Sequence, residues 1–322
     1  GYVTSNRETC TRQLFEIWVS VDGKFKRQNR MFNAPIGAGR VVFSDYDRDG
    51  DLDLIVPVCS PRPMCEETNE IAIFVNAQSS RSMTDLCAKR NFTLGWDKVY
   101  HVRFPADKRL AQTFRQDDGS YFPATIRAGD YNLDGYTDLV VPVIHTVETA
   151  PTDAGQRKQS LKLMLWTNVA CSSKSPDNCV RTFHEQTDGV DDLPVMEVPD
   201  TDFMPIYNGF FMDLDESGVL DILTTMVDPK SGNQTIRGYY NNYFNDAYFL
   251  KTHGLNGAKD RGAQMPGMTF KFSVSDLDGV KHPRINTQLT QSTYAALQPP
   301  YHLFGLGRTN GYVEDFFFGK VF

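Results

Sequence analysis

Hydrophobic residues along the chain fall in short runs that are rich in β-branched and aromatic side chains and are separated by polar turns. Typical runs lie at 40–43, 54–58 and 71–76. Runs of this length and composition, bounded by turn residues, predict β-strands. No segment shows a convincing helical period, so helices are not expected. The pattern predicts an all-β protein.

An acidic nine-residue segment follows a predicted strand at three places in the chain. Its copies begin at Asp45, Asp130 and Asp213, which are 85 and then 83 residues apart, and a second apolar run follows each copy. Self-similarity at a fixed spacing is typical of repeat architectures. The sequence therefore predicts related units in which the acidic segment connects two strands.

The three acidic segments place oxygen-bearing groups in the pattern of a calcium loop. Oxygen ligands at positions 1, 3, 5 and 9, with a main-chain carbonyl at position 7, can surround a hard cation with roughly six or seven oxygens. Glycine at position 6 permits the positive φ that wraps the loop around the ion. The predicted side-chain ligands are Asp45, Asp47, Asp49 and Asp53 in the first loop, Asp130, Asn132, Asp134 and Asp138 in the second, and Asp213, Asp215, Ser217 and Asp221 in the third. The predicted carbonyl ligands are those of Asp51, Tyr136 and Val219.

Other interpretations of these loops fit the sequence less well. An EF-hand needs a bidentate Glu at position 12, where this chain has Val56, Val141 and Thr224. An ordinary Asp-Gly turn would leave clustered carboxylates to repel one another. Magnesium demands a small, rigid octahedron and keeps its waters. We therefore expect two to three structural Ca²⁺ ions, with the third loop the weakest because Ser217 replaces a carboxylate.

Each unit also contains a later aromatic strand, at 71–76, 162–168 and 238–244, and a fourth such strand occupies 14–20. The spacing of the complete units would put the acidic loop of that fourth strand at or before residue 1. We therefore expect the chain to begin within a repeat.

Repeated strand–loop–strand units without helices predict a β-propeller, in which each unit is a small sheet packed on its neighbours. We expect this chain to hold the C-terminal portion of the ring, about four blades. The blades with the three cation loops are predicted within 1–267, and 268–322 would supply strands that complete the last blade or close the ring.

Composition and charge exclude several other classes of protein. Hydrophobic residues make up 40% of the chain and charged residues 23%, which is globular. With 33 Lys and Arg against 40 Asp and Glu, the net charge of −7 provides no basic stripe for nucleic acid. No apolar run approaches the about 20 residues of a membrane helix, so membrane attachment is expected only through a helix outside this chain.

The cysteines and sequons favour an extracellular or secreted location. Cys59 with Cys65, and Cys171 with Cys179, each bracket a short polar segment, as local disulfides do. Zinc is disfavoured because the spacings are not those of a zinc knuckle. A Cys10–Cys87 disulfide follows only by elimination. Asn91 and Asn233 begin glycosylation sequons.

No catalytic motif accompanies these features. The six His residues are scattered, and the chain lacks a nucleophile elbow, a phosphate-binding loop and a dinucleotide fingerprint. The paired carboxylates are already explained as cation ligands. We therefore expect a protein that is not an enzyme.

The loops resemble the FG-GAP repeats of the integrin α-subunit propeller, and the whole chain resembles the T-cell immunomodulatory protein family, also called Linkin. The motifs that carry the resemblance include Phe15–Trp18, Asn245–Leu250, Gln288–Ser292, Leu297–Tyr301 and Gly305–Arg308. The resemblance implies a single-pass surface protein with further propeller repeats before Gly1 and a membrane helix after Phe322.

These observations lead to a binding module as the first hypothesis. It would be a calcium-stabilised propeller ectodomain at the cell surface, with a role in protein recognition, adhesion or immunomodulation. An alternative is a non-catalytic propeller that accompanies a catalytic domain absent from this chain, for example a calcium-dependent hydrolase. A third possibility is a partial propeller that closes against another chain. The expected partners are a protein ligand or receptor and the missing N-terminal blades of the same protein.

Overall fold

A computed structural model of the chain describes residues 12–21, 24–59, 67–76, 99–103, 109–111, 113–115, 121–123, 125–147, 158–172, 179–186, 206–227, 231, 233–242, 246–257, 262–275, 278–289, 298–308 and 312–319. Every regular element in these segments is a β-strand, which confirms the all-β prediction. No helix long and apolar enough to cross a bilayer occurs in these segments.

Each acidic loop lies between the first two strands of an antiparallel sheet. The first repeat comprises β3 (Val42–Ser44), β4 (Asp53–Cys59), β5 (Glu67–Phe74) and β6 (Val99–Arg103). The second comprises β10 (Arg127–Gly129), β11 (Asp138–Val147), β12 (Lys158–Ala170) and β13 (Arg181–Glu185). The third comprises β14 (Ile206–Met212), β15 (Asp221–Val227) and β16 (Gln234–Tyr239). All three loops therefore join two strands, as the sequence predicts.

The remaining strands extend the row of sheets at both ends. A hairpin of β1 (Gln13–Val21) and β2 (Lys24–Ala34) precedes the first repeat. Short strands between the first two repeats are β7 (Arg109–Ala111), which pairs with both β5 and β11, and the pair β8 (Thr113–Arg115) and β9 (Tyr121–Pro123). After the third repeat, β17 (Tyr248–Thr252) pairs with β20 (His302–Gly307), and β18 (Met268–Ser275) lies between β19 (Lys281–Gln288) and β21 (Val313–Gly319).

Apolar residues on both faces of the strands explain how the sheets pack on one another. Along β4 and β5, Ile55 and Ile73 belong to a core shared with the second repeat, whereas Val56 and Ala72 belong to a core shared with the β1–β2 hairpin. Neighbouring residues point to opposite faces of a strand. A run that is apolar at every position therefore builds a sheet that is buried on both sides.

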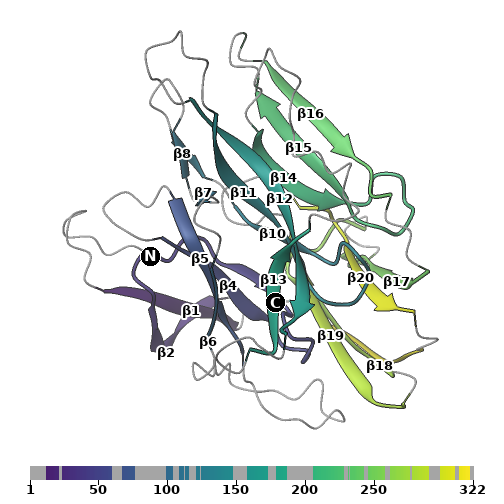
Figure 1. The fold of residues 1–322 in the computed structure, drawn as a ribbon. Coiled ribbons are helices and arrows are strands. Elements are labelled where there is room, and N and C mark those ends of the chain that lie inside the picture. Colours follow the sequence, from purple (N-terminus) through teal and green to yellow (C-terminus); the bar gives the residue numbers. More distant parts are fainter. Residues whose placement is uncertain are drawn as a thin grey trace.

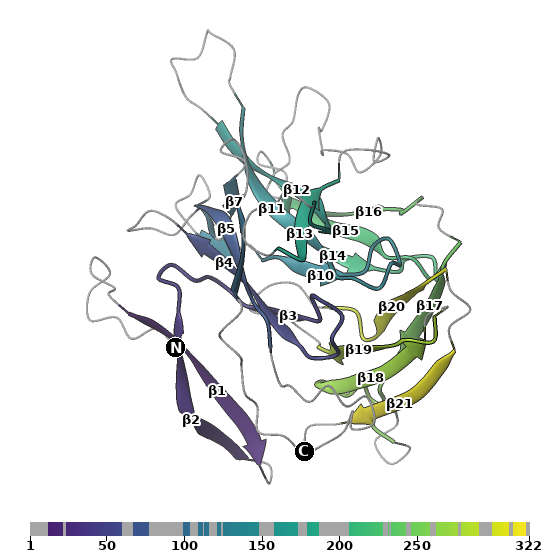
Figure 2. The ribbon, with the colours of Figure 1, turned by 60° about the horizontal axis from the view of Figure 1, so that its bottom comes forward.

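The second repeat repeats this arrangement one step along the chain. Leu139 and Val141 face the first repeat, and Val140 faces a core that contains Phe211 and Ile222 of the third repeat. The sheets consequently follow one another in chain order around an arc, from the β1–β2 hairpin to β18–β21 (Figures 1 and 2). The interpretation of this arc as part of a propeller ring stays a prediction.

The predicted boundary at residue 267 falls inside the C-terminal group of strands. β17, before the boundary, pairs with β20, after it, so the two sides share a sheet. A separate core of Met268, Phe270, Phe272, Val274 and Phe304 lies beneath β18 and β20. That residues 268–322 complete the last blade or close the ring stays a prediction.

Candidate metal centre

The three acidic loops have the same backbone conformation. Glycine at position 6 has a positive φ in each, 82° at Gly50, 84° at Gly135 and 87° at Gly218. The residue at position 4 also has a positive φ, 65°, 60° and 58° at Arg48, Leu133 and Glu216, although none of these is glycine. Residues other than glycine rarely adopt a positive φ. Its occurrence at position 4 of all three loops therefore indicates that the loops share one geometry.

Main-chain hydrogen bonds hold the loop closed around its first and last carboxylates. The N–H of position 6 donates to the position 1 carboxylate, at 3.2 Å for Gly50 to Asp45 and 2.9 Å for Gly135 to Asp130. The N–H of position 2 donates to the position 9 carboxylate, at 2.8 Å in the first and third loops and 2.9 Å in the second. The position 9 aspartates, which the sequence assigns only as ligands, thus also fix the turn.

An asparagine near the end of the third strand connects each loop to its own sheet, and in the second and third repeats it also bonds to the preceding repeat. The N–H groups of Asn76, Asn168 and Asn241 donate to the position 9 carboxylate of their own repeat at 2.7, 2.9 and 2.7 Å. The side-chain amide of Asn168 donates to the Tyr46 carbonyl at 3.0 Å, and that of Asn241 donates to the Tyr131 carbonyl at 3.0 Å. The same bond therefore joins the first repeat to the second and the second to the third.

Burial and mutual repulsion set the charge of the loops. Burial, followed by the charges of Asp49 and Asp47, raises the pKa of Asp45 well above its usual value. Burial, followed by the charge of Asp47, raises the pKa of Asp49 to about 7. In the second loop, burial and then Asp134 raise the pKa of Asp130 to about 7. Carboxylates in this state gain from any group that supplies positive charge.

The donor groups fit a calcium ion. Carboxylate oxygens of Asp45, Asp47 and Asp49 lie within 4.8 Å of one another, and so do those of Asp213, Asp215 and Asp221. In the second loop, Oδ1 of Asp130 is buried and accepts no hydrogen bond from any described group. A buried oxygen without a partner is costly, and an oxygen-seeking cation would satisfy it. A cavity of about 30 Å³ that Asp45, Asp130 and Arg284 help to line has room for one water, and Asn132, Asp134 and Asp138 do not line it.

The C-terminal strands contact all three loops. Lys271 of β18 pairs with Asp51 of the first loop, with 3.3 Å between Nζ and Oδ1. The Gly305 N–H of β20 donates to Asp130 of the second loop at 2.8 Å. In the third loop, Asp213 faces Lys251 of β17 at 3.0 Å. The loops therefore lie in an interface between the repeats and the C-terminal strands, and this could not be anticipated from the loop sequences.

Glycines in the loops and in β20 permit this close approach. A Cβ on Gly50 would lie 2.5 Å from Cβ of Pro283, and one on Gly305 would lie 2.2 Å from Oδ2 of Asp130. Arg284 is buried between the first two loops, where its charge lowers the pKa of Asp45 and Asp130 by less than burial raises it. Burial also lowers the pKa of Arg284 itself, to about 10, so the guanidinium stays charged.

Some of the cysteines and glycosylation sequons named in the sequence analysis lie within the described residues, and others do not. Cys171 and Cys179 form the predicted disulfide, with 5.9 Å between their Cα atoms. Cys59 ends β4, but Cys65, Cys10, Cys87 and Asn91 lie outside the described residues. Asn233 is exposed immediately before β16.

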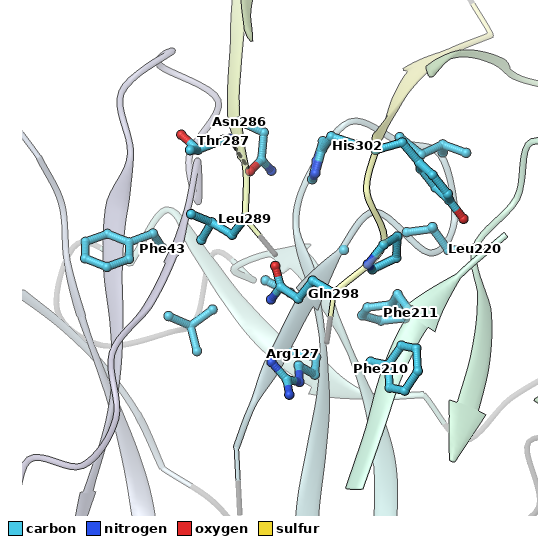
Figure 3. Close-up of a pocket in the computed structure, with 16 residues that line it drawn as sticks. Phe43, Arg127, Phe210, Phe211, Leu220, Asn286, Thr287, Leu289, Gln298 and His302 are labelled. Atoms are coloured by element: carbon cyan, nitrogen blue, oxygen red, sulfur yellow. Dashed lines mark hydrogen bonds between the residues drawn. The ribbon is translucent and has the colours of Figure 1, made fainter. Parts of the chain in front are cut away.

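A cavity of about 70 Å³ lies between the first strands of the repeats and the C-terminal strands. Its lining comes from β3, β10, β14, β19 and β20, and includes Arg127, Gln298 and His302 (Figure 3). Burial lowers the pKa of His302 to about 3, so its imidazole is neutral at physiological pH. Sites for drug-sized ligands usually enclose about 300–1,000 Å³. This cavity has room for a few waters but not for such a ligand.

Comparison with known proteins agrees with the resemblance along nearly the whole chain. The T-cell immunomodulatory protein of Homo sapiens is 28% identical over 332 residues, which are 98% of this chain and 48% of the human protein. The chain is a homologue of the T-cell immunomodulatory proteins. A homolog of that name from Plasmodium yoelii yoelii is 28% identical over 99% of this chain. Protein linkin of Caenorhabditis elegans is 26% identical over 86% of this chain.

The chain spans about half the length of these relatives, 48% of the human and Plasmodium yoelii yoelii proteins. A family model described as "ITFG1, C2 domain" matches residues 260–322. That region contains β18 to β21, the strands that contact the first two acidic loops. The similarity to the T-cell immunomodulatory proteins thus extends over both the acidic repeats and the strands that pack on them. The FG-GAP assignment of the repeats stays a prediction.

Proposed function

We propose that this chain is a non-enzymatic recognition module of a surface or extracellular protein, in which Ca²⁺ at the acidic loops stabilises a propeller-like row of sheets. Its partners would be other proteins, as the names of its relatives suggest at a coarse level. The calcium would act in the weak range typical of extracellular modules, roughly 10⁻⁴–10⁻³ M. The Cys171–Cys179 disulfide is compatible with an oxidising compartment.

One observation carries the calcium part of this proposal. The first two loops share one backbone conformation, and each brings a buried position 1 carboxylate against further oxygen donors. Oδ1 of Asp130 is buried and has no hydrogen-bond partner among the described residues, and an oxygen-seeking cation would satisfy it. Asp45 and Asp130 would hold the ions together with the other predicted ligands of their loops. The bound ions would offset the burial and the mutual repulsion that otherwise raise the pKa of these carboxylates.

The non-enzymatic part rests on what the described residues offer for chemistry. The acidic groups are engaged in turn formation and cation binding, and the cavity between the repeats is small. His302, which lines it, has its pKa lowered to about 3, too low for a base that works near neutral pH. Recognition of a protein by the exposed loops and strand edges is the function that this architecture supports best.

Thermal unfolding with and without calcium tests the proposal. A ligand that binds only the folded state stabilises it by about 2.7 kcal/mol per site at one hundred times its dissociation constant. We expect Ca²⁺ at roughly 10 mM to raise the melting temperature of the chain by several degrees, and Mg²⁺ at the same concentration to raise it much less.

The Asp45→Asn and Asp130→Asn variants serve as site controls. Each should lose one bound ion and part of the calcium-dependent stabilisation, and the double variant should lose most of it. Identical melting curves in calcium and in a chelator would contradict the structural role of calcium.

A further inference from the structure

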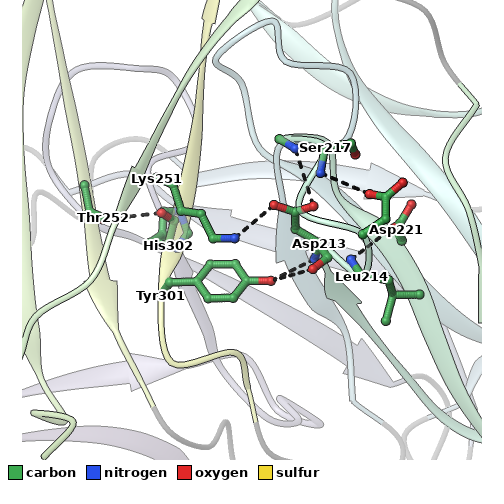
Figure 4. Close-up of polar contacts among 10 residues, drawn as sticks. Asp213, Leu214, Ser217, Asp221, Lys251, Thr252, Tyr301 and His302 are labelled. Atoms are coloured by element: carbon green, nitrogen blue, oxygen red, sulfur yellow. Dashed lines mark hydrogen bonds and ion pairs between the residues drawn. The ribbon is translucent and has the colours of Figure 1, made fainter.

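We propose that Lys251 is the resident cation of the third loop and keeps calcium out of it. The Lys251 Nζ lies 3.0 Å from Oδ2 of Asp213, which occupies position 1 of that loop. Figure 4 shows the side chain reaching from β17 to this carboxylate. The inference that Lys251 takes the place of calcium rests on the proposed calcium role of the first two loops. The Lys251–Asp213 ion pair is a feature of the structure and does not depend on that proposal.

Position 1 differs among the three loops in what it contacts. The two oxygens of Asp45 accept hydrogen bonds from the main-chain N–H groups of Asp49 and Gly50. Asp130 accepts two main-chain N–H groups on Oδ2 and keeps Oδ1 without a partner. Neither forms an ion pair with a described residue. Arg284 acts on Asp45 and Asp130 through its charge without an ion-pair contact. Among the described residues, a positively charged side chain contacts the position 1 carboxylate directly at Asp213 alone.

The Lys251–Asp213 pair is held in place on both sides. The Asp213 side chain is 1% exposed and that of Lys251 is 30% exposed. The ammonium lies 4.2 Å from the centre of the Tyr301 ring, a distance suited to a cation–π contact. The Tyr301 hydroxyl accepts a hydrogen bond from the Asp213 N–H at 2.8 Å (Figure 4). Removing either charged partner from such a site leaves the other uncompensated.

The serine at position 5 also makes the third loop a poorer calcium site than the first loop. Ser217 stands where the first two loops have an aspartate, so the third loop has one carboxylate ligand fewer than the first loop and the same number as the second. Calcium affinity becomes weaker as the number of charged ligands decreases. An ion would also have to displace the Lys251 ammonium from a carboxylate that is almost fully buried. The lysine thus supplies the positive charge without depending on the calcium concentration.

Lys271 provides a contrast within the same interface. It pairs with Asp51 of the first loop at 3.3 Å between Nζ and Oδ1. Position 7 is predicted to bind calcium through its main-chain carbonyl, so this side-chain pair leaves the ligand oxygens accessible. A lysine next to an acidic loop therefore blocks calcium only where it contacts a ligand atom.

Counting bound Ca²⁺ by equilibrium dialysis of the full chain tests the inference. We expect two ions per chain for the wild type and three for Lys251→Met, with the added site at least about tenfold tighter than any residual binding to the wild-type loop. The matched control Lys271→Met should keep two. Adding the exposed change Asp215→Ala, which removes the position 3 oxygen ligand, to Lys251→Met should remove the third ion, and this would assign the ion to the third loop.

Two further variants guard against misfolding. Lys251→Gln keeps a hydrogen-bond donor near Asp213 and should also gain an ion. Asp215→Ala alone removes an exposed ligand of the third loop and should leave the wild-type count at two. Loss of an ion from this variant overturns the inference, because it would show calcium in the wild-type third loop.

The outcomes separate this inference from the proposed function. A wild type that binds three ions, or Lys251 variants that fold and gain none, overturns the role of Lys251. A wild type that binds no calcium while Lys251→Met binds one supports the role of Lys251 and contradicts calcium binding at the first two loops. Two ions in the wild type and three in Lys251→Met support both.

Discussion

At the scale of single residues, the buried asparagines contribute more to the fold than the sequence suggests. The Asn241 amide donates to the carbonyls of Tyr131 and Leu220, at 3.0 and 3.1 Å, and so bridges two repeats. The sequence shows this residue only as part of an aromatic strand. Its role depends on a carbonyl 110 positions earlier, and no local pattern reports such a contact.

We expect Asn241→Ala to lower the free energy of unfolding by roughly 1–3 kcal/mol, because it leaves buried carbonyls without a donor. Urea denaturation of bacterially produced protein measures this change. Asn233→Ala, at an exposed position, is the matched control and should change stability by less than about 0.5 kcal/mol. Equal effects of the two substitutions would contradict the bridging role.

Protons and calcium compete for the same carboxylates, which gives the calcium-free chain an unusual response to pH. Asp49 and Asp130 have a pKa of about 7 in the folded chain, above the usual 3.8. The folded state therefore binds these protons more tightly than the unfolded state does. This contribution to stability is complete below the unfolded pKa and is lost as the pH rises through about 7.

We expect the free energy of unfolding of the calcium-free chain to fall as the pH rises from about 4 to about 7, and to level off above that range. Urea unfolding across this range, in metal-free buffer, measures the slope. Asp130→Asn removes one of the titrating groups and should flatten it, and saturating calcium should flatten or reverse it. A slope that is the same in the variant and the wild type would show that Asp130 does not titrate in this range.

At the scale of elements, glycine in the third loop makes room for β17. Gly218 has a φ of 87°, and a Cβ there would lie 2.1 Å from the Phe249 ring. Gly279, between β18 and β19, has a φ of 76° but no atom within 4 Å of its Cβ position. A side chain at Gly279 would therefore meet backbone strain alone, whereas one at Gly218 would meet both backbone strain and steric overlap with Phe249.

We expect Gly279→Ala to cost roughly 1–2 kcal/mol for the left-handed conformation alone. Gly218→Ala should cost roughly 1–3 kcal/mol more, because the ring of Phe249 must move. Chemical denaturation of both variants measures the difference. If Gly218→Ala were as mild as Gly279→Ala, the contact between the third loop and β17 would be wrong.

The sequence predicts elements well where the pattern is local and poorly where partners are distant. The acidic loops, their flanking strands, the glycines of positive φ and the Cys171–Cys179 bridge all follow from residues less than ten positions apart. The pairing of β17 with β20 and the contact of Gly305 with Asp130, 175 positions away, do not. Apolar alternation reveals that a strand is buried but not which sheet covers it.

At the scale of the whole molecule, shared cores link the sheets into one cooperative unit. One core joins the first two repeats, and another joins the second and third repeats with Leu303 of β20. Leu139, in the first of these cores, is 0% exposed. Unfolding of any one repeat would expose apolar surface of its neighbours.

We expect calorimetry in calcium to show a single transition whose calorimetric and van't Hoff enthalpies agree. Leu139→Ala should shift the whole transition, with a loss of about 2–5 kcal/mol, whereas Ile236→Ala, at a position 67% exposed, should barely change it. Two separated transitions in the variant would show that the repeats unfold independently.

The amide-to-carbonyl bond between successive repeats has a consequence for how such a chain can lengthen or diversify. The acceptor is a main-chain oxygen, at Tyr46 in one case and Tyr131 in the other, so the bond does not depend on which side chain that position carries. A duplicated or transplanted repeat would therefore attach to a new neighbour with the same geometry. Loop surfaces could then diverge freely in evolution while the joint between units is inherited unchanged.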